Sequence, residues 1–145
     1  MKVRPSLLVE TGARTMVPTL LVVSAFLLVV GHDSPGGGFV GGLLAGGALL
    51  VVFLSGGRAA VTSMLPVPAG AILGAGIMTA VATAIGGLVF GRALLDAGKL
   101  EIDAGWFGSW SVGSALLFDV GVFLVVVGLV STVLLQLGDP EEREE

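Results

Sequence analysis

The chain of 145 residues has no cysteine and only one histidine. Disulfides, thiol chemistry and thiolate metal sites are therefore excluded, and a conventional zinc site lacks the ligands it needs. Basic residues are also few, with seven Lys and Arg against eleven Asp and Glu, and they form no patch. A nucleic-acid-binding role is disfavoured for that reason.

Charge of either sign is scarce. Only 12% of the residues are charged and 54% are hydrophobic, whereas a soluble domain averages roughly 25% charged residues. The charges sit at the ends and in loops, and residues 139–145 carry most of the net charge of −4. A soluble protein of this length would need a polar surface, so the composition indicates an integral membrane protein, and the length suits one compact unit.

Four apolar runs are long enough to cross a bilayer, which takes about 20 residues of helix. The sequence predicts an all-α integral membrane protein with one domain over 1–145, an acidic cytoplasmic tail at 138–145, and spans at about 8–31, 39–54, 68–90 and 112–137. The first span could also be a signal peptide, but Glu10 and Arg14 just before its most apolar part argue against that alternative.

Lys and Arg counts predict the orientation, because cytoplasmic loops are enriched in them. An even number of spans places both termini on one side, together with five basic residues: Lys2, Arg4, Arg14, Arg58 and Arg143. The other side holds Arg92 and Lys99, so both termini are expected in the cytoplasm. The outer connection alternates in polarity over 99–103, which predicts a short strand, and Trp106, Phe107 and Trp110 suit an interfacial aromatic belt.

Glycine is abundant, with 24 residues, and several lie four apart: Gly42 with Gly46, Gly70 with Gly74, and Gly87 with Gly91. Small residues at this spacing allow helix backbones to approach closely in lipid. Two interpretations stay open. The four helices pack on one another through these faces, or the faces dock other proteins of the membrane.

A polar, glycine-rich segment follows the first span. Pro35 with Gly36, Gly37 and Gly38 cannot continue a regular helix cheaply, and His32 stands beside Asp33 at the end of the span. The segment is either a polar surface turn or part of a proton or cation relay, since histidine titrates near neutral pH. A phosphate-binding loop fits poorly, because the required Lys-Ser/Thr is missing.

Asp119 lies inside the fourth apolar run. An acid at the centre of a span costs roughly 2.5 to 3.5 kcal/mol on insertion scales, and such acids usually face a bundle interior or a water path. Asp119 is therefore either a hydrogen-bonded structural residue or part of an ion path. The topology places it in the outer half of the membrane, on the side of His32 and Asp33.

The remaining polar residues predict only local roles. Glu10 and Arg14 could form a surface ion pair, and four hydroxyls within spans are expected to bond back to their own helices: Thr79, Thr83, Ser131 and Thr132. No nucleophile–base pair, catalytic carboxylate pair or redox motif is present in the sequence, so the chain is not expected to be an enzyme.

Two segments together resemble a known family. GHDSPGGGFVGGL at 31–43, followed by SVGSALLFDVGVF at 111–123, is similar to the B subunit (MnhB/MrpB) of Mrp-type multisubunit sodium/proton antiporters. The likeness runs from the first span to the fourth. Family members commonly carry asparagine where this chain has Asp33 and tyrosine where it has Phe123.

The resemblance implies a multi-pass component of an antiporter complex in the prokaryotic plasma membrane, partnered by the other membrane subunits of that complex and by the lipid bilayer. The complex exchanges sodium for protons, which are cargo, and no cofactor is implied. This component supports assembly and lines part of the ion path. Asp119, His32 and Asp33 are then the ion-path candidates, and the structural motif is Pro35, Gly36, Gly37, Gly38 and Phe39.

Three alternatives stay open at this point. The chain could be the equivalent component of a membrane-bound hydrogenase-type energy-converting complex, or it could serve assembly in a purely structural way. It could also be a small transporter that works as a homo-oligomer, although few polar groups within the spans argue against this last option.

Overall fold

The structure is a computed structural model that describes residues 7–31, 37–89, 100–103, 109–112 and 114–137, with side chains over 11–31, 37–86 and 115–137. Its elements are α1 (Leu7–Val30), α2 (Gly37–Met64), α3 (Ala69–Val89), β1 (Leu100–Asp103), β2 (Ser109–Val112) and α4 (Ser114–Leu137). All four helices are long and apolar enough to cross a membrane. The predicted four-helix membrane fold is confirmed.

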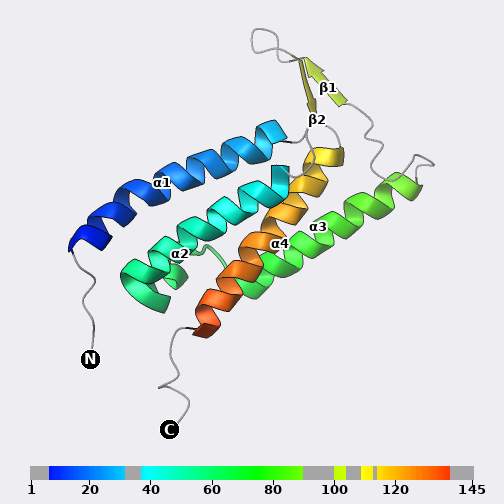
Figure 1. The fold of residues 1–145 in the computed structure, drawn as a ribbon. Coiled ribbons are helices and arrows are strands. Elements are labelled where there is room, and N and C mark those ends of the chain that lie inside the picture. Colours follow the sequence, from blue (N-terminus) through cyan, green and yellow to red (C-terminus); the bar gives the residue numbers. More distant parts are fainter. Residues whose placement is uncertain (1–6, 32–36, 90–99, 104–108, 113, 138–145) are drawn as a thin grey trace.

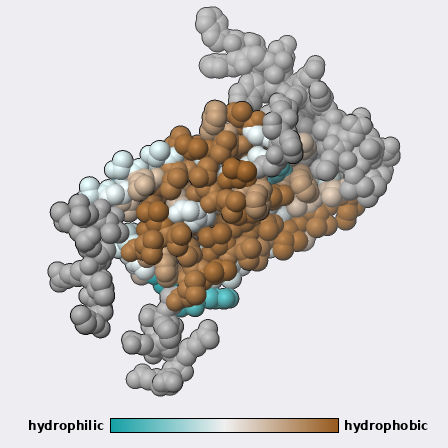
Figure 2. Space-filling model, in the orientation of Figure 1, coloured by the Kyte–Doolittle hydropathy of each residue, from teal (hydrophilic) through white to brown (hydrophobic). Residues whose placement is uncertain are grey.

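The helices form a row rather than a closed bundle (Figure 1). Helix α1 packs on α2, α2 packs on α4, and α4 packs on α3, whereas α1 makes only a small contact with α4. The last helix in the sequence is therefore inserted between the second and the third. A row leaves broad faces uncovered, and Figure 2 shows hydrophobic residues over the visible face of the helices.

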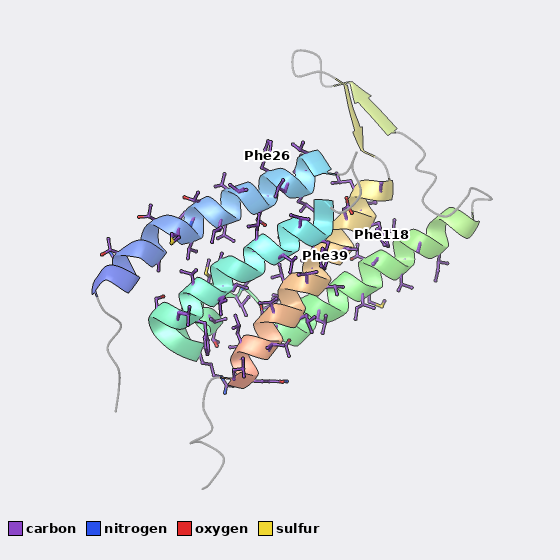
Figure 3. The ribbon with its side chains drawn as sticks, in the orientation of Figure 1. Phe26, Phe39 and Phe118 are labelled. Atoms are coloured by element: carbon purple, nitrogen blue, oxygen red, sulfur yellow. The ribbon has the colours of Figure 1, made fainter. Side chains whose placement is uncertain are left out.

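Many large apolar side chains lie on these uncovered faces. Phe26 is 60% exposed and projects from α1 (Figure 3), and Met78 on α3 is 72% exposed. In water such surfaces would be an aggregation hazard. In a bilayer they are the expected contact with lipid or with other transmembrane helices.

Helix α2 runs ten residues beyond the span expected at 39–54. Its regular course is interrupted at Gly57, which has φ +65° and ψ −161°. These angles are accessible essentially to glycine alone, so the chain bends sharply there and continues in helical form to Met64. Hydropathy places the end of the span at Leu54 because Gly56, Gly57 and Arg58 lower it, but it does not register a helix that continues past a bend.

A short hairpin lies between α3 and α4. Strand β1 pairs antiparallel with β2, and Ile102 lies opposite Trp110. The strand predicted from the alternation at 99–103 is thus confirmed over Leu100–Asp103. Its partner strand was not predicted. Of the three aromatic residues expected at the membrane interface, Trp106 and Phe107 lie outside the described residues.

Glycine allows α2 to approach α4 closely. A Cβ atom at Gly42 would lie 2.8 Å from the Cβ of Val126, and one at Gly46 would lie 3.0 Å from a methyl carbon of Val130. Both distances are tighter than ordinary van der Waals contact, so only glycine fits without a shift. The self-packing interpretation of Gly42 and Gly46 is confirmed.

The second predicted glycine pair behaves differently. A Cβ atom at Gly70 or Gly74 would meet nothing within 4 Å, and both residues are exposed. Self-packing through this pair is therefore wrong. Helix α3 instead approaches α4 through Gly76, where a Cβ atom would lie 2.6 Å from the Val125 nitrogen. Of the third pair, Gly91 and the surroundings of Gly87 lie outside the described residues.

Candidate functional site at the junction of α1, α2 and α4

The end of α1 and the start of α2 meet backbone to backbone. A Cβ atom at Gly37 would lie 2.6 Å from the carbonyl carbon of Gly31. Side chains at either position would force the two helix ends apart. Gly31 at the end of α1 and Gly37 at the start of α2 therefore lie against each other.

The start of α2 also rests on the backbone of Asp119 in α4. A Cβ atom at Gly38 would lie 2.8 Å from both the Cα and the carbonyl carbon of Asp119. Neighbouring backbones cannot yield as a flexible side chain can, so this contact requires glycine. The two segments on which the family resemblance depends, far apart in the sequence, are thus joined directly by Gly38 and Asp119.

A hydrogen bond ties α1 to α2 one turn deeper. The hydroxyl of Ser24 donates to the carbonyl oxygen of Gly41 at 2.7 Å, and Ser24 is only 1% exposed. A Cβ atom at Gly41 would lie 2.9 Å from the Ser24 carbonyl oxygen, so the helices touch at this level. Hydrogen bonds between transmembrane helices contribute about 0.6 kcal/mol on average and up to about 1.7 kcal/mol. The bond helps to hold α1 in register beneath the junction.

Ser24 was missed by sequence reasoning. The available signal was a hydroxyl inside the most apolar part of the first span, but a serine there can equally bond to its own helix. The hydroxyls that were singled out do so: Thr79 bonds to the Ala75 carbonyl, Thr83 to that of Thr79, Ser131 to that of Val127, and Thr132 to that of Gly128. Those four predictions are confirmed.

The structure describes only some of the other candidate residues. Asp119 is half-buried, and Phe39, in the first turn of α2, is 51% exposed. His32, Asp33, Pro35 and Gly36 lie outside the described residues, as does the side chain of Glu10. Among the residues that the structure describes, no three His, Cys, Asp or Glu side chains come close enough to hold a metal ion. What the described part of the junction offers is one carboxylate beside closely packed backbone.

The family model described as "Domain related to MnhB subunit of Na+/H+ antiporter" matches residues 8–132. The chain belongs to this family. The match includes the whole junction, with both Gly38 and Asp119. The resemblance inferred from the two motifs is confirmed.

Individual MnhB-related proteins agree with this assignment. The B subunit of the Na(+)/H(+) antiporter of Bacillus subtilis (strain 168) is 35% identical over 135 residues, which cover 93% of this chain and 94% of that protein. A Rhizobium meliloti (strain 1021) protein, named as the probable A/B subunit of a K(+)/H(+) antiporter, is 32% identical over 130 residues. Those residues cover 90% of this chain but only 13% of the Rhizobium protein.

A solved structure shares the fold. A chain in the structure of the Mrp complex from Dietzia sp. DQ12-45-1b matches with a TM-score of 0.75 and 32% sequence identity. The match covers 95% of this chain and 14% of that one. In Rhizobium and Dietzia, then, the MnhB-related unit corresponds to a small part of a much longer polypeptide.

Proposed function

We propose that this chain is a membrane subunit of a multisubunit cation/proton antiporter in a prokaryotic plasma membrane, and that it is not itself catalytic. The family match over residues 8–132 carries the proposal. The relatives described above bear antiporter names and not hydrogenase names, which favours the antiporter over a hydrogenase-type complex. The long Rhizobium polypeptide, whose name combines the A and B components, supports a place beside a larger protein of the complex.

The distribution of charge supports dependence on partners. Among the residues with described side chains, only Arg14, Arg58 and Asp119 are charged. Ion routes across a membrane are lined by polar groups, carbonyls or charged rings along their length. One acid near one end of α4 does not make such a route, so other subunits must supply the rest. The uncovered face of α3 with Gly70 and Gly74 offers a smooth surface for them.

Within that complex we assign Asp119, His32 and Asp33 to the neighbourhood of the ion path. The contact of Gly38 with the Asp119 backbone supports this grouping, because it brings the start of α2 to the one acid within the described spans. Cations and protons are the cargo, and the chain needs no bound cofactor. Sodium is the first cation to test and potassium the second, in view of the names of the relatives.

On its own, the chain is expected to give no exchange. Inverted vesicles that contain only this chain should show no sodium- or potassium-dependent proton movement, because Asp119 is the only acid among the side chains that the structure describes. Co-expression with its partners in the complex should restore exchange, and a tag on this chain should recover a large assembly. Robust exchange by the isolated chain would instead support the small homo-oligomeric transporter.

We also propose that the start of α1, the end of α2 and the end of α4 face the cytoplasm. These three helix ends lie on the same side of the molecule (Figure 1), and five of seven Lys and Arg belong to that side of the predicted topology. The chain has no cysteine, so single cysteines report cleanly. In intact cells an impermeant maleimide should label Ser109→Cys in the hairpin but reach Ser63→Cys only after permeabilisation. The reverse pattern would invert the topology.

A further inference from the structure

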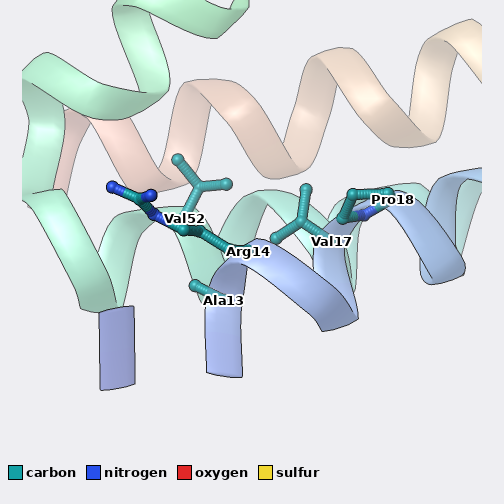
Figure 4. Close-up of a pocket in the computed structure, with 5 residues that line it drawn as sticks. All are labelled: Ala13, Arg14, Val17, Pro18 and Val52. Carbon is teal, nitrogen blue, oxygen red and sulfur yellow. The ribbon is translucent and has the colours of Figure 1, made fainter. Parts of the chain in front are cut away.

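A groove lies between α1 and α2 near the start of α1. It is a cavity of about 260 Å³ lined by Ala13, Arg14, Val17 and Pro18 from α1 and by Val52 from α2 (Figure 4). Four of these five residues are apolar. In Figure 4, Arg14 stands at one end of the row of lining residues and Pro18 at the other. The groove is thus apolar along most of its length, with the positively charged side chain of Arg14 at one end.

The groove lies near the start of the first predicted span, where the sequence places Arg14 close to the membrane boundary. Helix α1 begins at Leu7, so Arg14 lies about two turns from its start and Pro18 one turn further along. An Arg at this level directs its guanidinium toward the headgroups while its stem stays among apolar groups. We therefore expect the Arg14 guanidinium at the level of the lipid headgroups and the apolar lining at the level of the acyl chains.

Charge favours a lipid as the occupant. Arg14 stands at one end of an otherwise apolar groove, and an anionic headgroup joined to an acyl chain has the complementary arrangement. Part of one acyl chain fits such a space. A guanidinium carries five N–H donors in a planar fork, so Arg14 can keep an interaction within the protein and still donate to phosphate oxygens.

We propose that this groove binds an anionic phospholipid, with part of an acyl chain along Val17, Pro18 and Val52 and the phosphate on Arg14. Basic pockets between transmembrane helices are suited to anionic lipid headgroups. Arg58, exposed just after the bend in α2, adds positive charge near the same ends of the helices but does not line the groove. The site is separate from the junction of Gly38 with Asp119, and its assignment does not depend on the ion carried.

The test compares two arginines. The tagged chain is purified with its accompanying proteins in neutral detergent, equilibrated with equal amounts of phosphatidylglycerol and phosphatidylcholine, and washed, and the retained lipid is counted by mass spectrometry. The wild-type protein should retain more phosphatidylglycerol than phosphatidylcholine. Arg14→Gln should lose about one phosphatidylglycerol per chain. Arg58→Gln, which removes the same charge outside the groove, should retain the wild-type amount.

A second variant tests the groove without changing charge. Val52→Phe adds bulk from the α2 side and should also lose about one phosphatidylglycerol per chain. Equal retention in wild type and Arg14→Gln would overturn the proposal, as would equal losses in the two arginine variants, since general surface charge would then explain binding. Loss of a partner protein in place of lipid from Arg14→Gln would overturn it too, because the groove would then belong to a protein interface.

Discussion

Replacing Gly38 by alanine is expected to remove most of the assembled protein from the membrane. The added Cβ would lie 2.8 Å from the Cα and carbonyl carbon of Asp119, and backbone cannot move aside without shifting α2 from α4. Overpacking in a protein interior typically costs about 1 to 3 kcal/mol, and a contact with backbone belongs at the upper end of that range. The amount of chain that co-purifies with its partners on a native gel measures the effect.

Gly47→Ala is the matched control. It lies on the same helix, and a Cβ atom there would meet nothing within 4 Å. Alanine is favoured over glycine by about 0.8 to 1.0 kcal/mol in a helix interior, and neither substitution disfavours the helix. A loss of assembly in Gly38→Ala alone therefore reports the contact with Asp119. Normal assembly of Gly38→Ala, at the level of Gly47→Ala, would show that α2 and α4 are not so close in the assembled protein.

Some of this architecture could be predicted because membrane insertion imposes strong constraints. Every backbone group in lipid must be satisfied within a helix, so apolar runs of sufficient length predict the four spans. The bend at Gly57 could not be predicted in the same way. Hydropathy reports where a segment is apolar, whereas the continuation of α2 to Met64 depends on backbone angles that only glycine accepts.

The spacing of the glycines predicted that helices would approach one another closely, but it did not predict which helix would pack on which pair. Gly42 with Gly46 and Gly70 with Gly74 have the same spacing, yet the first pair packs on α4 and the second is open. The difference follows from the order of the helices in the row, which places α4 beside both α2 and α3. That order is a long-range property, and the local pattern of small residues does not contain it.

The candidate site was predicted in part. The topology placed Asp119 in the same half of the membrane as the glycine-rich segment, and the contact of Gly38 with Asp119 agrees with this placement. The backbone contact between the two segments could not be inferred from the sequence. Gly38 has no side chain, so no pair of complementary side chains indicates that it lies against Asp119. Ser24 escaped notice for a similar reason, since its acceptor is a backbone carbonyl that every residue possesses.

Neutralising Asp119 is expected to abolish most of the exchange while the complex still assembles. Asparagine keeps the size and one carbonyl acceptor but loses the charge. A hydrogen bond to a charged group contributes about 1.5 to 3 kcal/mol, and a loss of this size in cation binding would weaken apparent affinity roughly tenfold or more. Asp119→Asn should therefore require much more sodium for half-maximal exchange in inverted vesicles, whereas Asp119→Glu, which keeps the charge one methylene further out, should retain part of the activity.

Alanine at the same position separates charge from hydrogen bonding. If Asp119 serves only as an acceptor, Asn should work nearly as well as Asp, and Ala should disrupt assembly because a donor would be left unpaired away from water. Assembly on a native gel and sodium-dependent exchange at several pH values distinguish the two cases. Gln136→Ala, an exposed polar change near the far end of α4, should alter neither measurement. Full activity of Asp119→Asn, with unchanged dependence on sodium and pH, would leave Asp119 a packing residue and remove the ion path from this junction.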